Sequence, residues 1–204
     1  MIEVFIEKIK VVLQNLPVAT EISMSLTCEN TSDFIGLKKE TFGIKHVDNK
    51  TTAFEIGSVT KAITGNVLAK LVTESRIKLD DTIASFLPFK LSGNPSITFK
   101  QLALHTSGLP RMPKGYDDRA NFMVENPFSN FDEDDFIHYL SKDLVLESNP
   151  GEKAIYSNLG YALLSYIISN IENKPFSRIV KERIFLPLRM ENTSLNAKDI
   201  LVQF

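Results

Sequence analysis

The order of helical and strand-like patterns constrains the fold of this chain most. Apolar residues recur at helical spacing at the start of the chain, at Ile2, Phe5, Ile6, Ile9, Leu13 and Leu16. Apolar and polar residues then alternate from Glu21 to Thr27, which predicts a half-buried strand. Strand-like runs also span residues 33–39 and 41–47, before a turn signal at residues 48–50.

Helical patterns dominate the rest of the chain. They cover residues 58–72, 79–88, 97–105, 132–140, 160–171 and 175–186. We expect the helix over residues 79–88 to be short and capped, and Thr98 to cap the helix over residues 97–105. Residues 111–130 are polar and predict a long surface loop. Helices therefore interrupt strands, which indicates an α/β or α+β class. With 43% hydrophobic residues and no repeat or linker, we expect residues 1–204 to belong to one domain with a sizeable core.

The tetrapeptide Ser58-Val59-Thr60-Lys61 opens the first of these later helices. A serine at a helix start and a lysine one turn later place a hydroxyl and an amine on one face. This is the arrangement of a serine nucleophile served by a lysine. The free N–H groups at a helix N-terminus also favour a developing negative charge. The alternative is a helix cap beside a solvated lysine.

A second Ser-x-x-Lys sequence, from Ser75 to Lys78, lies where the helical pattern ends. It lacks a helix N-terminus, so we interpret Ser75 as an exposed serine. Tyr156-Ser157-Asn158 is the second chemical element, between a turn and a buried-type helix. Residues two apart on extended backbone point the same way, so both outer side chains could face Ser58. The alternative is a packed tyrosine and a turn asparagine.

Together these blocks resemble the serine β-lactamase-related family. The blocks that carry the resemblance, in order, are Phe54–Lys61, Leu102–Pro110, Pro150–Glu152 with Tyr156–Asn158, and Phe185–Leu188 with Met190. A tyrosine in the second motif is similar to the class C β-lactamase branch, with its D-Ala-D-Ala carboxypeptidase and esterase relatives. The resemblance implies an α+β sandwich, in which an antiparallel sheet packs against a helical cluster.

The resemblance also implies roles for individual residues. Ser58 would be the acylated nucleophile, and Lys61 and Tyr156 would share the work of general base and acid. Asn158 would orient Lys61 and bind the substrate, an ester, amide or β-lactam. Ser58 N–H would form half of an oxyanion hole.

Members of the family carry a third motif, a Lys-Thr-Gly or His-x-Gly sequence. This motif is not found here, because no lysine, arginine or histidine is followed two positions later by glycine. We therefore expect a chain truncated at the C-terminus, a single incomplete domain without its last strands. A missing oxyanion donor costs about 10²–10³ in rate. An unpaired sheet edge would allow self-association.

Composition argues against several partners. Lysine and arginine total 23 and aspartate and glutamate 25, a net charge of −2, so we do not expect nucleic acid binding. The single cysteine, Cys28, cannot form an internal disulfide and is expected to be a small core residue. His46, His105 and His138 lack metal-ligand spacing, so we expect no metal and no cofactor. We interpret His105 as structural.

The N-terminal pattern also predicts a location. Charged residues interrupt its apolar stripe, so we expect neither a signal peptide nor a membrane span, and a cytoplasmic protein. Two functional hypotheses stay open. One is a serine hydrolase that works through an acyl-enzyme. The other is a catalytically inactive fragment that binds a partner or folds only with a complementing chain.

Overall fold

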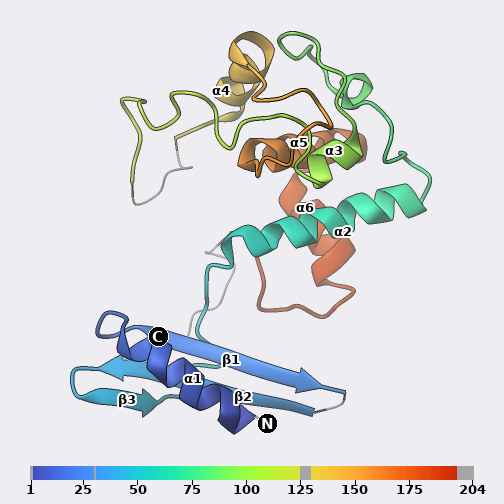
Figure 1. The fold of residues 1–204 in the computed structure, drawn as a ribbon. Coiled ribbons are helices and arrows are strands. Elements are labelled where there is room, and N and C mark those ends of the chain that lie inside the picture. The colour runs from blue at the N-terminus through green and yellow to red at the C-terminus, as the bar shows by residue number, and fades with distance from the viewer. Residues whose placement is uncertain (1, 30, 125–129, 197–204) are drawn as a thin grey trace. The chain divides into compact units, whose positions relative to one another are not determined.

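The computed structural model describes residues 2–29, 31–124 and 130–196, which form two compact units (Figure 1). The first unit ends at Glu55 and the second begins at Ile56. Strands occur in the first unit and helices in both, so the α+β class is confirmed. Whether the two units belong to one domain stays a prediction. Among the described residues, every helix is too short or too polar to cross a bilayer.

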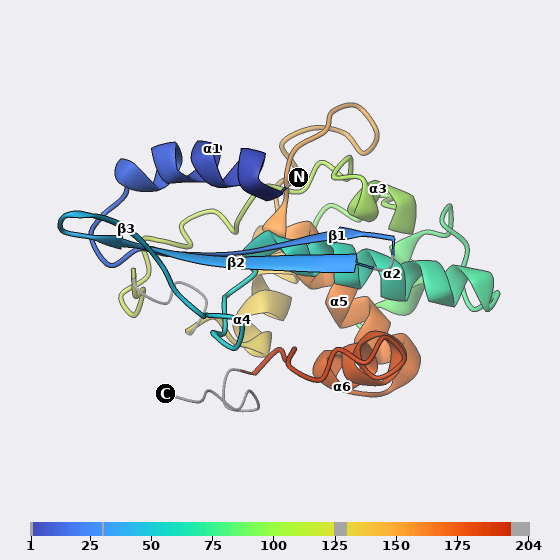
Figure 2. The same cartoon turned by 90° about the horizontal axis from the view of Figure 1, so that it is seen from below.

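The first unit combines an antiparallel sheet with one helix. In its described part, strands pair in the order β1–β2–β3 and span Glu21–Cys28, Thr31–Glu40 and Gly43–His46. Helix α1, Ile2–Gln14, lies along one face of this sheet (Figure 2). There the fully buried Leu13 packs with Ile35 and Leu37. The predicted amphipathic helix, the alternating strand β1 and the two further strands are confirmed.

The prediction that Cys28 is a core residue is wrong, because its side chain is exposed. The alternation of β1 puts Cys28 on the same face as Ile22 and Met24, which pack against the cluster under α1. However, Cys28 pairs with Thr31 at the last position of the β1–β2 hairpin. The strand continues there beyond the buried cluster.

The second unit consists of helices and turns over its described residues. In chain order they are η1 (Gly57–Val59), α2 (Thr60–Thr73), η2 (Ile83–Phe86), α3 (Phe99–Ala103), α4 (Glu133–His138), η3 (Tyr139–Asp143), α5 (Asn158–Glu172), α6 (Phe176–Val180) and η4 (Lys181–Phe185). The predicted loop has no helix or strand over residues 111–124, and residues 125–129 lie outside the described residues. Thr98 caps α3 as predicted: its side chain accepts a hydrogen bond from Gln101 N–H.

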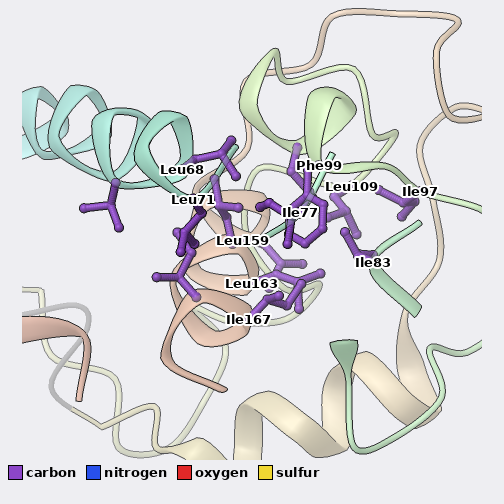
Figure 3. Close-up of a cluster of buried hydrophobic side chains, with 14 of the residues drawn as sticks. Leu68, Leu71, Ile77, Ile83, Ile97, Phe99, Leu109, Leu159, Leu163 and Ile167 are labelled. Carbon is purple, nitrogen blue, oxygen red and sulfur yellow. The ribbon is translucent and has the colours of Figure 1, made fainter. Parts of the chain in front are cut away.

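One apolar core holds these helices together. Leu68 and Leu71 of α2 face Leu159, Leu163 and Ile167 of α5 (Figure 3). Phe99 of α3, Leu109 from the segment after it, and the isoleucines at positions 77, 83 and 97 belong to the same cluster. Because α2 and α5 share this core, the segments at their N-terminal ends are held in a fixed relation.

The predicted capped helix over residues 79–88 is wrong, because only a 3₁₀ turn, η2, forms there. The carbonyl oxygens of Leu79 and Asp81 accept hydrogen bonds from Lys100 N–H and Phe99 N–H, at 2.8 and 3.3 Å. A helix would need these carbonyl groups for its own first turns. Contact with the start of α3 therefore replaces the local helix.

Replacing glycine with alanine should have opposite effects on stability at two positions of the second unit. Gly108 has φ +76°, and an added Cβ would lie 2.1 Å from Ser148 O. We expect Gly108→Ala to lower the free energy of unfolding by about 1–3 kcal/mol. Gly65 lies inside α2 with no atom within 4 Å of an added Cβ, so Gly65→Ala should raise it by about 0.5–1 kcal/mol. Urea unfolding measures both, and equal effects would contradict this assignment.

Candidate active site

Ser58 lies in the turn η1, directly before α2. Gly57 takes a left-handed φ of +49° there, a conformation that glycine adopts without steric cost. The Ser58 side chain is exposed and lies at the positive end of the α2 dipole. The expected position of this serine at a helix start is therefore observed, with a 3₁₀ turn as the first part of the helix.

Lys61 lies one turn further along and connects the two predicted motifs. Its Nζ donates to Ser58 Oγ at 3.2 Å and to Asn158 Oδ1 at 2.8 Å. The Lys61 Nζ also lies 4.8 Å from the ring centroid of Tyr156 and 5.5 Å from that of Tyr161. Such contacts with ring faces stabilise a cation.

Tyr156 reaches the same serine from the other motif. Its hydroxyl donates to Ser58 Oγ at 2.6 Å, so Ser58 Oγ accepts hydrogen bonds from both Lys61 and Tyr156. The tyrosine is 40% exposed, which leaves the hydroxyl pair accessible from solvent. The structure thus brings together Ser58, Lys61, Tyr156 and Asn158, the four residues singled out in the sequence.

Ser157 explains why the second motif has this shape. Its backbone is extended and its side chain caps α5 by accepting from Gly160 N–H at 2.8 Å. The same hydroxyl donates to Pro110 O at 2.7 Å, and Asn158 N–H donates to Arg111 O at 3.0 Å. A buried cap therefore fixes the residue between Tyr156 and Asn158.

The electrostatics of the site favour a charged phenol oxygen. The Lys61 ammonium holds the pKa of Tyr156 below its usual value of 10.0, and the Ser58 hydroxyl and the Arg111 charge act in the same direction. Burial opposes this shift. The site therefore places a tyrosine that is more acidic than a free phenol within hydrogen-bond distance of Ser58 Oγ.

Sequence reasoning missed several neighbours of the site. The guanidinium of Arg111 lies 5.4 Å from the Tyr156 ring centroid, and Met112 Sδ accepts from Asn158 Nδ2 at 3.6 Å. The residues Arg111 and Met112 come from the predicted loop, where no spacing marked them. Across the described residues, no group of three or more His, Cys, Asp or Glu is placed to hold a metal.

An antiparallel sheet, a helical cluster and a serine contacted by a lysine and a tyrosine are typical of serine hydrolases of the β-lactamase and transpeptidase type. The chain belongs to the β-lactamase family, because the family described as Beta-lactamase matches residues 42–201. The predicted resemblance and the β-lactamase/transpeptidase-like fold are confirmed.

Particular relatives support this membership. Protein flp of Staphylococcus aureus (strain NCTC 8325 / PS 47) is 35% identical over 162 residues, which are 75% of this chain and 31% of flp. The D-alanyl-D-alanine-carboxypeptidase/endopeptidase AmpH of Escherichia coli (strain K12) is 34% identical over 145 residues, which are 68% of this chain and 36% of AmpH. The chain therefore spans about a third of the length of the curated relatives it matches.

Solved structures share the fold. The β-lactamase/D-alanine carboxypeptidase from Yersinia pestis, complexed with citrate, matches with a TM-score of 0.71 and 25% identity, over 90% of this chain and 54% of that chain. The octameric penicillin-binding protein homologue from Pyrococcus abyssi matches with a TM-score of 0.67 and 26% identity, over 97% of this chain and 44% of that chain. Both structures share the fold over at least 90% of this chain.

Proposed function

We propose that this chain is a serine hydrolase that works through an acyl-enzyme on the carbonyl group of an ester, amide or β-lactam. The observation that carries the proposal is the pair of hydrogen bonds from Lys61 and Tyr156 to one exposed hydroxyl, Ser58 Oγ. A solvated serine beside a helix cap would not need both partners. The name of AmpH, a carboxypeptidase and endopeptidase, supports a substrate of the amide class.

In the proposed first step, Tyr156 accepts the hydroxyl proton while Ser58 Oγ attacks the carbonyl carbon. The Lys61 ammonium stabilises the phenolate form of Tyr156, which is the direction in which it shifts the pKa of this tyrosine. The bond from the carbonyl carbon to the leaving group then breaks, and the proton passes from Tyr156 to the leaving group. In the second half, the oxygen of a water molecule attacks the ester carbon while Tyr156 accepts a water proton. The bond to Ser58 Oγ then breaks, and the proton passes from Tyr156 to Ser58 Oγ.

Asn158 and the start of α2 have supporting roles in this proposal. The Asn158 Oδ1 accepts from Lys61 Nζ. Among the described residues, the Asn158 amide nitrogen donates to the weak acceptor Met112 Sδ, so it can donate to a substrate in its place. Ser58 N–H would donate to the carbonyl oxygen as negative charge develops there. The helix dipole of α2 adds to this stabilisation.

We further propose that both units belong to one β-lactamase-related domain, since the match to the Yersinia pestis structure covers 90% of this chain. A second candidate function is an inactive chain that binds a partner or needs a complementing chain. The small share of the curated relatives that this chain spans favours testing it. Self-association through a sheet edge stays a prediction.

The test is the intact mass of the 204-residue chain after incubation with a fluorophosphonate or, separately, with a penicillin. We expect one adduct, which Ser58→Ala abolishes, because Ser58 Oγ accepts hydrogen bonds from both a lysine and a tyrosine. Ser75→Ala is the matched control: it removes the serine of the other Ser-x-x-Lys sequence and should leave the adduct unchanged. No adduct from folded protein would favour the second candidate.

A further inference from the structure

His105 lies behind the second motif of the site, at the end of α3. It takes a left-handed φ of +59°, which is uncommon outside glycine. Its backbone is held on both sides, because its N–H donates to Leu102 O at 3.2 Å and its carbonyl accepts from Ile155 N–H at 2.8 Å. The imidazole is therefore presented from a fixed position.

The ring nitrogen of His105 holds the backbone of the second motif. Its Nδ1 accepts a hydrogen bond from Ser157 N–H at 3.1 Å. Ser157 is the buried cap of α5, so both its backbone amide and its hydroxyl group form hydrogen bonds within the helical unit. Tyr156 and Asn158 lie on either side of this residue, and their directions depend on it.

The ring faces of His105 contact two tyrosines. Ring centroids are 4.6 Å apart for His105 and Tyr156, with an interplanar angle of 32°, and 5.0 Å apart for His105 and Tyr161, with 38°. The Tyr161 hydroxyl donates to Ala103 O at 2.9 Å, which anchors that ring to α3. The Tyr156 ring therefore packs against the His105 ring, which in turn packs against the anchored ring of Tyr161.

The hydrogen bond from Ser157 requires a neutral imidazole with its proton on Nε2, because a protonated ring has N–H groups at both nitrogens. Burial lowers the pKa of His105, and the Lys61 charge lowers it further. The titratable groups beside the ring are Lys61 from α2, Tyr156 and Tyr161, with Arg111 over the Tyr156 ring. Near neutral pH these surroundings favour the acceptor form.

We propose that His105 is a positioning residue: by accepting Ser157 N–H and stacking on Tyr156, it holds the Tyr156 hydroxyl on Ser58 Oγ. The inference rests on the proposed function only in that Tyr156 assists Ser58. His105 itself contacts neither the serine nor the substrate carbonyl in this mechanism.

The test compares two substitutions in two backgrounds. His105→Phe keeps a ring but removes the acceptor, and His105→Asn keeps an acceptor oxygen and tolerates the left-handed backbone. We expect His105→Phe to slow fluorophosphonate acylation of Ser58 by about 10²-fold, the cost of a small misplacement, and His105→Asn to retain most of the rate. In the Tyr156→Phe background, His105→Phe should cost less than about twofold. His138→Phe, at an exposed histidine, is the control.

Equal losses in the two backgrounds would overturn the proposal, because a merely structural residue would act without Tyr156. A rate unchanged by His105→Phe, or an Asn variant as slow as the Phe variant, would also overturn it.

A measurement on the unmodified chain needs neither a variant nor activity. In NMR titrations, the Ser157 amide signal should shift with the pKa of His105, because protonation breaks their hydrogen bond. A Ser157 signal that does not move through this titration would overturn the proposal. Absence of acylation in the unmodified chain would instead count against the proposed function, and the titration would still test His105.

Discussion

Replacing Lys61 with methionine is expected to slow acylation of Ser58 by about 10²–10⁴-fold, the range for a positioned acid–base group. The substitution removes the hydrogen bonds to Ser58 Oγ and Asn158 Oδ1. It also removes the largest cause of the lowered Tyr156 pKa. With a higher pKa, less of Tyr156 is in the phenolate form at a given pH, and only the phenolate can take the Ser58 proton.

The pH dependence separates this effect from a general loss of structure. In the unmodified chain, the acylation rate should rise with pH around a midpoint below 10.0, since the charged form of Tyr156 grows as pH passes its lowered pKa. In Lys61→Met the midpoint should move upward. Intact mass at timed intervals across pH 6–11 gives both rates.

The chain supplies a matched control for Lys61. Lys78 ends the other Ser-x-x-Lys sequence and is exposed, so Lys78→Met should leave rate and midpoint unchanged. An unaltered rate in Lys61→Met would show that this lysine does not serve Ser58.

Truncating Leu163 to alanine is expected to lower the free energy of unfolding by about 3–5 kcal/mol, the cost of a large cavity in a packed core. Leu163 is 0% exposed and lies in the middle of α5, facing the cluster shared with α2 (Figure 3). Urea unfolding should show a lower midpoint with an unchanged slope.

Leu188→Ala is the same substitution at a side chain that is 66% exposed, and it should cost less than about 0.5 kcal/mol. Similar losses at the two positions would contradict the assignment of Leu163 to the core. Because Asn158 begins α5, acylation by the Leu163 variant should be measured well below its unfolding midpoint.

Elements set by local patterns could be predicted from the sequence. Helix α1 and strand β1 follow their apolar periodicity, and Thr98 caps α3 as predicted. Predictions were wrong where contacts with a distant segment determine the local conformation or the burial of a side chain. The carbonyl groups of residues 79 and 81 bind the start of α3, and the burial of Cys28 depends on how far the core extends along β1.

The site divides in the same way. Ser58 and Lys61 lie on one turn, so spacing alone could place them together. The spacing of Tyr156 and Asn158 on extended backbone indicated that they could face Ser58, whereas their roles came from the family resemblance. The role of His105 could not be inferred from sequence, because its partner Ser157 is 52 residues away. Arg111 and Met112 lie in a loop whose course depends on Pro110 O and Arg111 O as acceptors.

The hydrogen bond between Tyr156 and Ser58 joins residues 98 positions apart. Closing a loop of this length has an entropic cost that has to be met before the contact forms, so we expect this contact to form late in folding. A chain with α2 formed but α5 not yet packed would carry Ser58 and Lys61 without Tyr156. The rate at which an acylating reagent labels Ser58 during refolding should therefore rise when α5 packs against α2. Measuring this rate over time would show when the two halves of the helical unit come together.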